Sequence, residues 1–181
     1  MNFQKYNFEN LYRKIENGLF SWATVKLYYS VFYLLRASLS IKGVGLYRWG
    51  RDAFFLGYDK AEFQKMDGLH KSDHKGVIYL QQRYYSTSDN LLQSSIEGQV
   101  PYYWLMDKRE FVNYKHKTFK EPDAPEFWKK ISETKTEKDI NYLIDLYLND
   151  TTLSYCFDEE HSVLATPLQR LKLTCRDFEN S

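Results

Sequence analysis

Hydrophobic residues recur at helical spacing over much of the chain, and the clearest run covers residues 22–41. One apolar stripe of this run holds Val25, Tyr28, Phe32, Leu35 and Leu39, and a second holds Leu27, Val31, Leu34 and Ile41. A helix that is apolar on most sides needs cover all round, so we expect this one at the centre of a helical bundle. Ser21 is its expected N-cap. Lys42-Gly43 is its expected end, because glycine readily takes the left-handed conformation that closes a helix.

Helical spacing predicts further helices along the chain. The expected ranges are 8–19, 61–66 (one or two turns), 72–84 with Ser72 as cap, a short turn at 91–92, 101–117, 125–133, 137–150 and about 166–176. Pro101 and Pro167 stand near predicted helix starts, where proline is favoured, and the helix from Pro101 should stop before Glu121-Pro122. The expected inward residues are Val77, Ile78, Leu80 and Tyr84, then Ile140, Leu143, Ile144 and Tyr147, then Leu168, Leu171 and Cys175.

Residues 44–58 break this pattern, since they are rich in glycine and aromatic residues and lack a helical period. They fit an irregular insertion or a small hairpin that turns near Trp49-Gly50. The chain has 181 residues, near the usual size of one domain, and shows no linker or internal repeat. The sequence therefore predicts a single all-α domain over 1–181, with a small irregular or hairpin insertion at 44–58.

Charge and composition limit the partners that this domain can attract. Lys and Arg total 25 against 24 Asp and Glu, for a net charge of +1, so any site for a polyanion must be a local patch. Aromatic residues make up 18% of the chain, with 16 Tyr among them, which suits both a packed core and a protein interface.

The two cysteines and the first residues indicate the compartment. Cys156 and Cys175 form no CxxC motif, and the first residues mix charges and amides where a secretory signal would be apolar. The tract 22–41 has about the length of a bilayer span, yet it carries Lys26 and Arg36, whose insertion is costly. A buried helix is favoured over a membrane span, and a cytoplasmic protein without membrane attachment is expected.

The most suggestive polar group lies in the helix predicted from Pro101. Arg109, Asn113 and His116 stand at i, i+4 and i+7, so all three project from one helical face. Arginine can bind a phosphate with paired hydrogen bonds, histidine can move a proton at a ribose hydroxyl, and asparagine can orient either. An ordinary solvated helix face explains the same three residues.

Two histidines, His70 and His74, lie four residues apart. A metal site with Asp67 or Asp73 is one interpretation, but HExxH is absent and Gly68 and Ser72 place His70 before the helix. We therefore expect no metal and no cofactor, and either histidine could instead approach Arg109. The motifs GxGxxG, GxxxxGK[ST] and GxSxG are also absent, which disfavours nucleotide-driven work and serine hydrolase chemistry.

Two further groups are candidates for binding RNA or a partner. Lys26, Tyr29 and Arg36 lie on the long helix, where core packing with polar tips at the edge is the ordinary alternative. A second set, Tyr47, Arg48, Trp49 and Arg51, belongs to the irregular segment. Such a string can stack single-stranded bases while its arginines hold phosphates, and it serves equally well as a partner-binding loop.

The run from Lys26 to Ala37, KLYYSVFYLLRA, resembles the YYA-x-F-x-x-x-R-A-L helix of HEPN-like proteins, which are small α-helical bundles common in bacterial toxin-antitoxin and antiphage systems. The resemblance covers one helix. Many members are metal-independent RNases that use Arg-x(4 to 6)-His, often completed across a dimer interface, and Arg109 and His116 fit the longest spacing. The chain departs from the family in Glu110, an acid directly after the arginine, and in Tyr33, where a histidine is usual.

The resemblance implies a bacterial defence or toxin component that binds RNA and cleaves it without metal, as a homodimer or a subunit of a larger complex. His116 would be the general base or acid, Arg109 would stabilise the phosphorane and Asn113 would orient the phosphate. The alternative is a non-catalytic HEPN-like adaptor that binds a protein partner through the aromatic surface near Tyr47 and Trp49.

Overall fold

The computed structural model describes residues 19–59, 62–68, 72–114, 125–134 and 136–180. Its elements are α2 (Phe20–Ile41), β1 (Gly45–Trp49), β2 (Asp52–Leu56), β3 (Gln64–Met66), α3 (Asp73–Tyr85), η2 (Asn90–Leu92), α4 (Pro101–Tyr114), η3 (Glu126–Trp128), α5 (Lys129–Ser132), α6 (Glu137–Asn149), η4 (Ser154–Phe157) and α7 (Glu159–Glu179). The chain is thus mainly helical with one small sheet, as predicted. The helix expected at 8–19 lies outside the described residues.

Helix α2 is the central element of the bundle. Its buried residues are Phe20, Ala23, Thr24, Leu27, Tyr28, Val31, Phe32, Leu35, Ser38 and Leu39. Both predicted stripes contribute to this set, although Val25, Leu34 and Ile41 are only half-buried. Gly43 closes the helix with a φ of +67°, while Val44 N–H donates to the carbonyl of Leu39 and Gly43 N–H to that of Ser40. This is the paired bonding of a Schellman motif. The predicted N-cap is wrong, because Ser21 lies inside the helix and Leu19 occupies the cap position without a side-chain bond.

The segment after α2 forms the predicted hairpin, and a third strand extends it. β1 pairs with β2 in antiparallel register from Gly45↔Leu56 to Trp49↔Asp52, and the turn contains Gly50 at a φ of +61°. β2 also pairs with β3, antiparallel, in the order β1-β2-β3. The helical turns expected over 61–66 are wrong for Gln64–Met66, which gain strand bonds from the neighbouring β2 that a local pattern does not reveal.

Helices α3 and α4 begin where the sequence predicts. Ser72 accepts a hydrogen bond from the backbone N–H of Lys75, and α4 starts at Pro101. Val77, Ile78 and Leu80 are buried as expected, but Tyr85 replaces Tyr84 in the core. The short turn expected at 91–92 is η2, and the expected stop before Glu121-Pro122 lies outside the described residues.

The C-terminal helices differ most from prediction at the start of the last one. In α6, a capping box between Thr136 and Asp139 fixes the start, and Ile140, Ile144 and Tyr147 are buried. Helix α7 begins at Glu159, well before the expected 166, so Pro167 lies in its interior. Leu168 is buried, whereas Cys175, predicted to face inward, is exposed.

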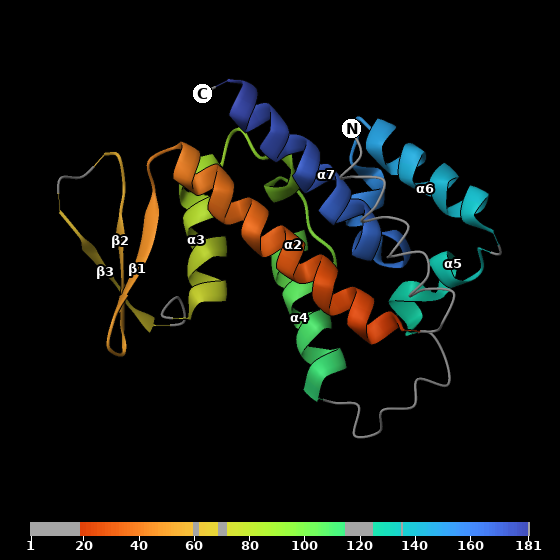
Figure 1. Cartoon of the computed structure of the whole chain (residues 1–181), viewed down its shortest axis with the longest axis horizontal. Coiled ribbons are helices and arrows are strands. Elements are labelled where there is room, and N and C mark those ends of the chain that lie inside the picture. The colour runs from red at the N-terminus through yellow and green to blue at the C-terminus, as the bar shows by residue number, and fades with distance from the viewer. Residues whose placement is uncertain (1–18, 60–61, 69–71, 115–124, 135, 181) are drawn as a thin grey trace.

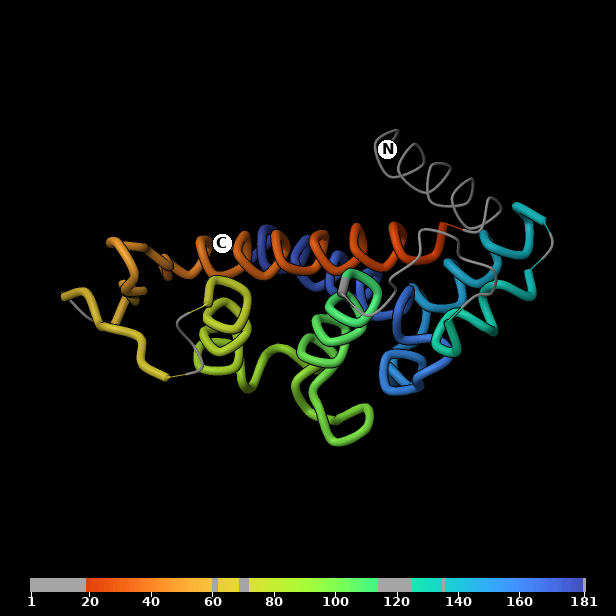
Figure 2. Tube along the Cα trace, turned by 90° about the horizontal axis from the view of Figure 1, so that it is seen from below, coloured from red at the N-terminus to blue at the C-terminus, as the bar shows by residue number. Residues whose placement is uncertain are grey.

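The helices pack on both sides of α2. In Figure 1, α2 and α7 run side by side in the same direction, and the sheet stands at the end of the molecule where α2 finishes. Figure 2 shows α3 and α4 together beneath α2, which has close contacts with both. None of the described helices combines the length and hydropathy needed to cross a lipid bilayer.

A buried ionic network fixes α2, α4 and α7 relative to one another. The guanidinium of Arg170 in α7 donates to Asp89 at 2.9 Å, to Asp177 at 2.8 Å and to the hydroxyl of Ser38 in α2 at 2.8 Å. Asp89 also accepts from the hydroxyl of Tyr102 in α4 at 2.6 Å. Because Arg170 and Asp89 are both fully buried, the network tolerates little displacement of these helices.

Candidate functional site

Arg109 of α4 packs against two consecutive tyrosines of α2. Its Nη2 donates to the Tyr29 hydroxyl at 2.9 Å, and its guanidinium carbon lies 5.5 Å from the ring centroid of Tyr28 and 5.3 Å from that of Tyr29. The side chain is only 12% exposed, and its buried Nε has no acceptor among the described residues. The Nε donor is closed to solvent, so an anion would have to bind Arg109 through its outer Nη groups.

His74 of α3 meets the same tyrosines. Its Nδ1 is 2.8 Å from the Tyr28 hydroxyl, and its ring centroid lies 5.7 Å from that of Tyr29 and 4.6 Å from that of Phe32. Burial is the main effect that lowers the pKa of His74, and the positive charge of Arg109 lowers it further. The negative charges of Asp73 and Glu110 raise the pKa, but by less. The imidazole is thus kept neutral near neutral pH, which is the form that accepts a proton.

We call Arg109, His74, Tyr28 and Tyr29 the Arg109 cluster. Successive residues of a helix point about 100° apart, so the adjacent tyrosines of α2 reach toward α3 and α4 together. Burial raises the pKa of Tyr28, which keeps its hydroxyl protonated as a hydrogen-bond donor. Helices α2, α3 and α4 thus bring a guanidinium and an imidazole into contact with the same two tyrosine rings.

The described contacts of this cluster include neither the remaining predicted catalytic residues, Asn113 and His116, nor the predicted binding residue His70. Asn113 is exposed one turn beyond Arg109. His116 and His70 lie outside the described residues. Glu110 places Oε1 at 4.0 Å from Nη1 of Arg109, so a carboxylate competes with any anion there.

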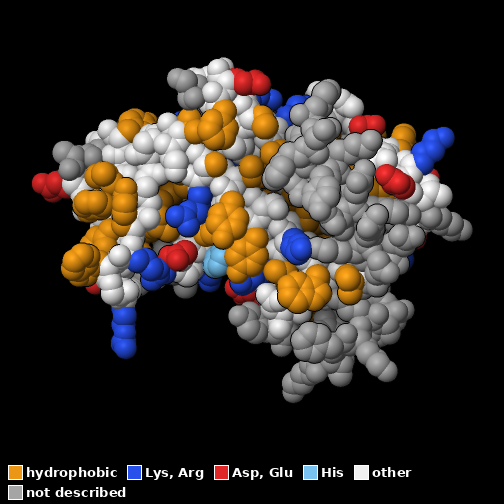
Figure 3. All heavy atoms as spheres, viewed as in Figure 1, with side chains coloured by type: hydrophobic (Ala, Val, Ile, Leu, Met, Phe, Trp, Pro, Cys, Tyr) orange, Lys and Arg blue, Asp and Glu red, His pale blue; other side chains and the backbone are white. Residues whose placement is uncertain are grey.

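The outer face of α2 continues the site as a row of aromatic and basic residues. We call this row the α2 stripe; it consists of Trp22, Lys26, Tyr29, Tyr33 and Arg36. Lys26 and Arg36 are exposed, as are Trp22 (56%) and Tyr33 (61%), and α2 contains no acidic residue. Figure 3 shows basic and hydrophobic side chains next to one another on this face, with a histidine and acidic side chains beside them.

Sequence reasoning missed Trp22 and Tyr33 as surface residues of this row. Lys26, Tyr29, Tyr33 and Arg36 follow Trp22 at four, seven, eleven and fourteen residues. This helical spacing is the signal that would have identified Trp22 and Tyr33 as part of the row.

The predicted hairpin residues divide into an exposed set and a paired one. Trp49 is 83% exposed, Arg51 is exposed, and Tyr47 contacts Phe63 edge to face at 5.1 Å. Arg48 forms an ion pair with Asp73 at the start of α3, so its guanidinium is engaged within the chain. These side chains lie on the sheet, and none of the contacts described for them reaches the Arg109 cluster.

Among the described residues, no group of three His, Cys, Asp or Glu side chains is arranged to hold a metal ion. A scan against protein-family models finds no match, and searches of the curated proteins and of the solved structures find none either.

Proposed function

We propose that this protein binds single-stranded RNA across the α2 stripe and the Arg109 cluster, and cleaves it without a metal ion. In this proposal the chain is a HEPN-like component of a bacterial defence or toxin system, and works as a homodimer or within a protein complex. The KLYYSVFYLLRA run in α2 supports the family assignment, since the same helix carries Tyr28 and Tyr29.

The observation that carries this proposal is the incomplete hydrogen bonding of Arg109. A largely buried guanidinium normally has acceptors for its N–H groups, because an unmet buried donor is costly. Here Tyr29 accepts one bond and the Nε donor is unmet among the described residues. A phosphodiester supplies charged oxygens that match the fork of N–H groups.

The α2 stripe supports single-stranded RNA as the source of that phosphate. Exposed rings can stack on successive bases while Lys26 and Arg36 attract the backbone, and no carboxylate on α2 opposes it. A duplex would hide the bases from Trp22 and Tyr33.

The cleavage step that this chemistry supports is an attack by the neighbouring ribose hydroxyl. A neutral imidazole removes the proton of the 2′-hydroxyl, the 2′-oxygen bonds to phosphorus, and the bond from phosphorus to the 5′-oxygen breaks as that oxygen takes a proton. Arg109 stabilises the charge on the phosphorane. His74 is one source of the imidazole, because its other ring nitrogen has no partner among the described residues, and His116 is the other.

A cleavage assay in the presence of EDTA tests the proposal. Wild-type protein, with its cellular partners added, should cut a 5′-labelled RNA to products ending in a 2′,3′-cyclic phosphate. Arg109→Ala and the double variant His74→Ala/His116→Ala should each lose this activity by about a hundredfold or more. Arg176→Ala, which removes an exposed arginine from α7, is the matched control. Equal cutting by Arg109→Ala contradicts the cleavage proposal.

Binding is tested separately by fluorescence anisotropy with a labelled single-stranded 12-mer. Tyr33→Ala should weaken RNA binding by about fivefold or more, because stacking of one base on an aromatic ring contributes roughly 1–3 kcal/mol. Tyr142→Ala is the matched control, since Tyr142 is similarly exposed on α6.

A second candidate function, a non-catalytic adaptor, is favoured by the aromatic surface of the sheet. Trp49, Tyr47 and Phe63 leave large apolar areas in solvent, which is typical of a protein interface. An adaptor predicts that Trp49→Ala abolishes co-purification of the cellular partner while Arg109→Ala leaves both the complex and its cellular activity intact. The reverse pattern supports RNA binding as the function.

A further inference from the structure

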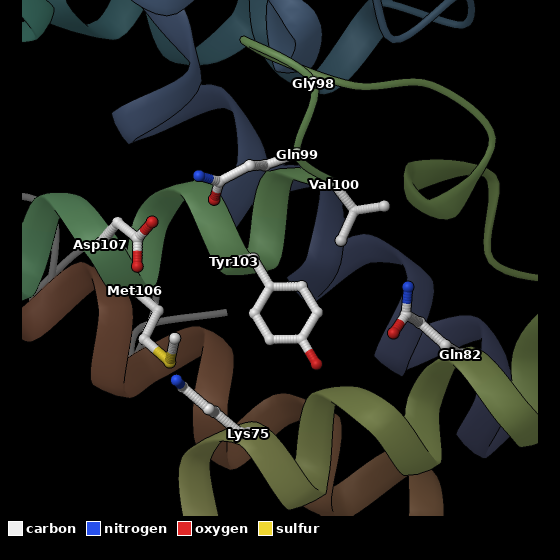
Figure 4. Close-up of a pocket in the computed structure, with 8 residues that line it drawn as sticks. All are labelled: Lys75, Gln82, Gly98, Gln99, Val100, Tyr103, Met106 and Asp107. Carbon is white, nitrogen blue, oxygen red and sulfur yellow. The ribbon is translucent and has the colours of Figure 1, made fainter. Parts of the chain in front are cut away.

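A separate hollow opens between α3 and α4, beside the Arg109 cluster. Its volume is about 430 Å³, within the range of small-molecule sites in proteins. Its lining includes Lys75 and Gln82 of α3, Tyr103 and Asp107 of α4, and Gln99 of the loop before α4 (Figure 4). The ring of Tyr103 stands in the middle of the hollow, with Met106 beside it.

The polar groups of this hollow are not used by the fold. Among the described residues, no side-chain hydrogen bond or ion pair engages Lys75, Gln82, Gln99, Tyr103 or Asp107. Burial raises the pKa of Tyr103, so its hydroxyl stays protonated and can donate. Five polar side chains from three segments thus face one space with their bonding capacity free.

The loop that carries Gln99 is held in a strained but fixed conformation. Ile96 and Gln99 exchange backbone hydrogen bonds of 2.8 and 2.9 Å around a two-residue turn. Both turn residues have positive φ, +51° at Glu97 and +78° at Gly98, which is unfavourable for glutamate. Glu97 is tied down by Trp104 Nε1 at 3.0 Å and Lys108 Nζ at 3.3 Å. The rim is therefore preorganised, and such strain is common at binding sites.

The residue types define the ligand. An aromatic ring offers a stacking surface for a planar heterocycle. Each glutamine amide presents a donor and an acceptor, as does the edge of a nucleobase, while an ammonium suits a phosphate and a carboxylate accepts from sugar hydroxyls. We propose that the hollow binds one nucleotide unit, with the base against Tyr103, its edge read by Gln82 and Gln99, and the phosphate at Lys75.

The unit has two possible sources, a free nucleoside monophosphate or one nucleotide of the RNA bound at the Arg109 cluster. Lys75 follows His74 in α3, and Met106 precedes Arg109 by one turn of α4, so the hollow borders that cluster. Binding of a nucleotide of the RNA rests on the proposed function, whereas binding of a free nucleoside monophosphate does not.

Isothermal titration calorimetry with AMP, GMP, CMP and UMP, each alone, tests the free nucleotide, and anisotropy with the 12-mer RNA tests the second source. The variants are Lys75→Met and Gln82→Ala, and the matched control is Lys138→Met, which changes an exposed lysine of α6. If a monophosphate binds, both pocket variants should weaken it about tenfold. If only RNA binds, both should weaken the RNA about tenfold while Lys138→Met leaves it unchanged.

The proposal is overturned if no monophosphate binds and both pocket variants hold RNA as tightly as wild type. If RNA binding is then lost only in Arg109→Ala, the result supports the proposed function and excludes the pocket from RNA binding. Conversely, a monophosphate that binds a protein unable to hold RNA supports the pocket and contradicts the proposed function. Unchanged urea midpoints in the two variants exclude loss through unfolding.

Discussion

Arg109 donates a 2.9 Å hydrogen bond to the hydroxyl of Tyr29, which lies 80 positions earlier in the chain. The ring of Tyr29 also meets His74 edge to face at 5.7 Å. One tyrosine of α2 therefore contacts the charged group of α4 and the titratable group of α3. The packing of α2 against α3 and α4 therefore positions the guanidinium and the imidazole around one ring.

Glu110 lies beside this arginine and opposes an incoming phosphate. Its carboxylate is 4.0 Å from Nη1 of Arg109 and about half exposed, so it competes for the guanidinium without a strong ion pair. We expect Glu110→Gln to tighten binding of the 12-mer RNA by about two- to fivefold at low salt, measured by anisotropy. Glu179→Gln, distant on α7, should have no effect. Weaker binding by Glu110→Gln would place the RNA elsewhere.

The pH dependence of stability reports on His74. Its folded-state pKa lies below the ordinary value of 6.5, because burial and Arg109 disfavour the charged form. Between pH 6.5 and the lower folded pKa, the unfolded chain binds a proton at His74 and the folded protein does not. The free energy of unfolding therefore falls as the pH is lowered through this range. Above 6.5 the contribution is constant.

Urea unfolding at several pH values measures this effect. His74→Gln keeps an acceptor for the Tyr28 hydroxyl but cannot titrate, so its stability should fall less than that of wild type between pH 6.5 and the folded pKa. Identical pH profiles for the two proteins would show that His74 is not desolvated beside Arg109.

The Arg170 network predicts a large stability effect far from the site. Arg170→Met leaves Asp89 buried without its cation, which should cost about 3–5 kcal/mol in urea unfolding. Arg176→Ala on the same helix should change stability by less than about 0.5 kcal/mol, because its side chain is exposed.

A double variant separates the ion pair from simple loss of packing. Arg170→Met/Asp89→Asn should be less destabilised than the sum of the single variants, because the second change removes the uncompensated charge. Additive losses would mean that packing dominates.

Local signals in the sequence predicted several elements well. Ser72 caps the start of α3 with its side-chain oxygen, and Pro101 begins α4. Gly43 and Gly50 take the positive φ that a helix end and a hairpin turn require. The apolar period of α2 predicted its central place, since that depends only on the order of residues along one helix.

The features that sequence reasoning missed depend on partners distant in the chain. Pro167 resembles a helix start, but in α7 it lies inside a helix whose surroundings keep it folded. Arg170 finds Asp89 across 81 positions, and β3 exists only because β2 lies beside it. No pattern within a short window carries this information.

The candidate site illustrates the same division. The chemistry of Arg109 is evident from its residue type and from its neighbours in the helix. Its contacts with Tyr28 and Tyr29, which also contact His74, arise from the packing of three helices. The same packing leaves Asn113 exposed to solvent.

The most direct measurement is the salt dependence of RNA affinity for wild type, Arg109→Ala and Arg176→Ala, using the labelled single-stranded 12-mer. If Arg109 lies at the centre of the RNA site, Arg109→Ala should bind RNA at least about tenfold more weakly than wild type. The slope of its salt dependence should decrease by roughly one phosphate contact, while Arg176→Ala should match wild type. An Arg109→Ala protein with wild-type affinity and slope would contradict the proposal that this cluster binds RNA.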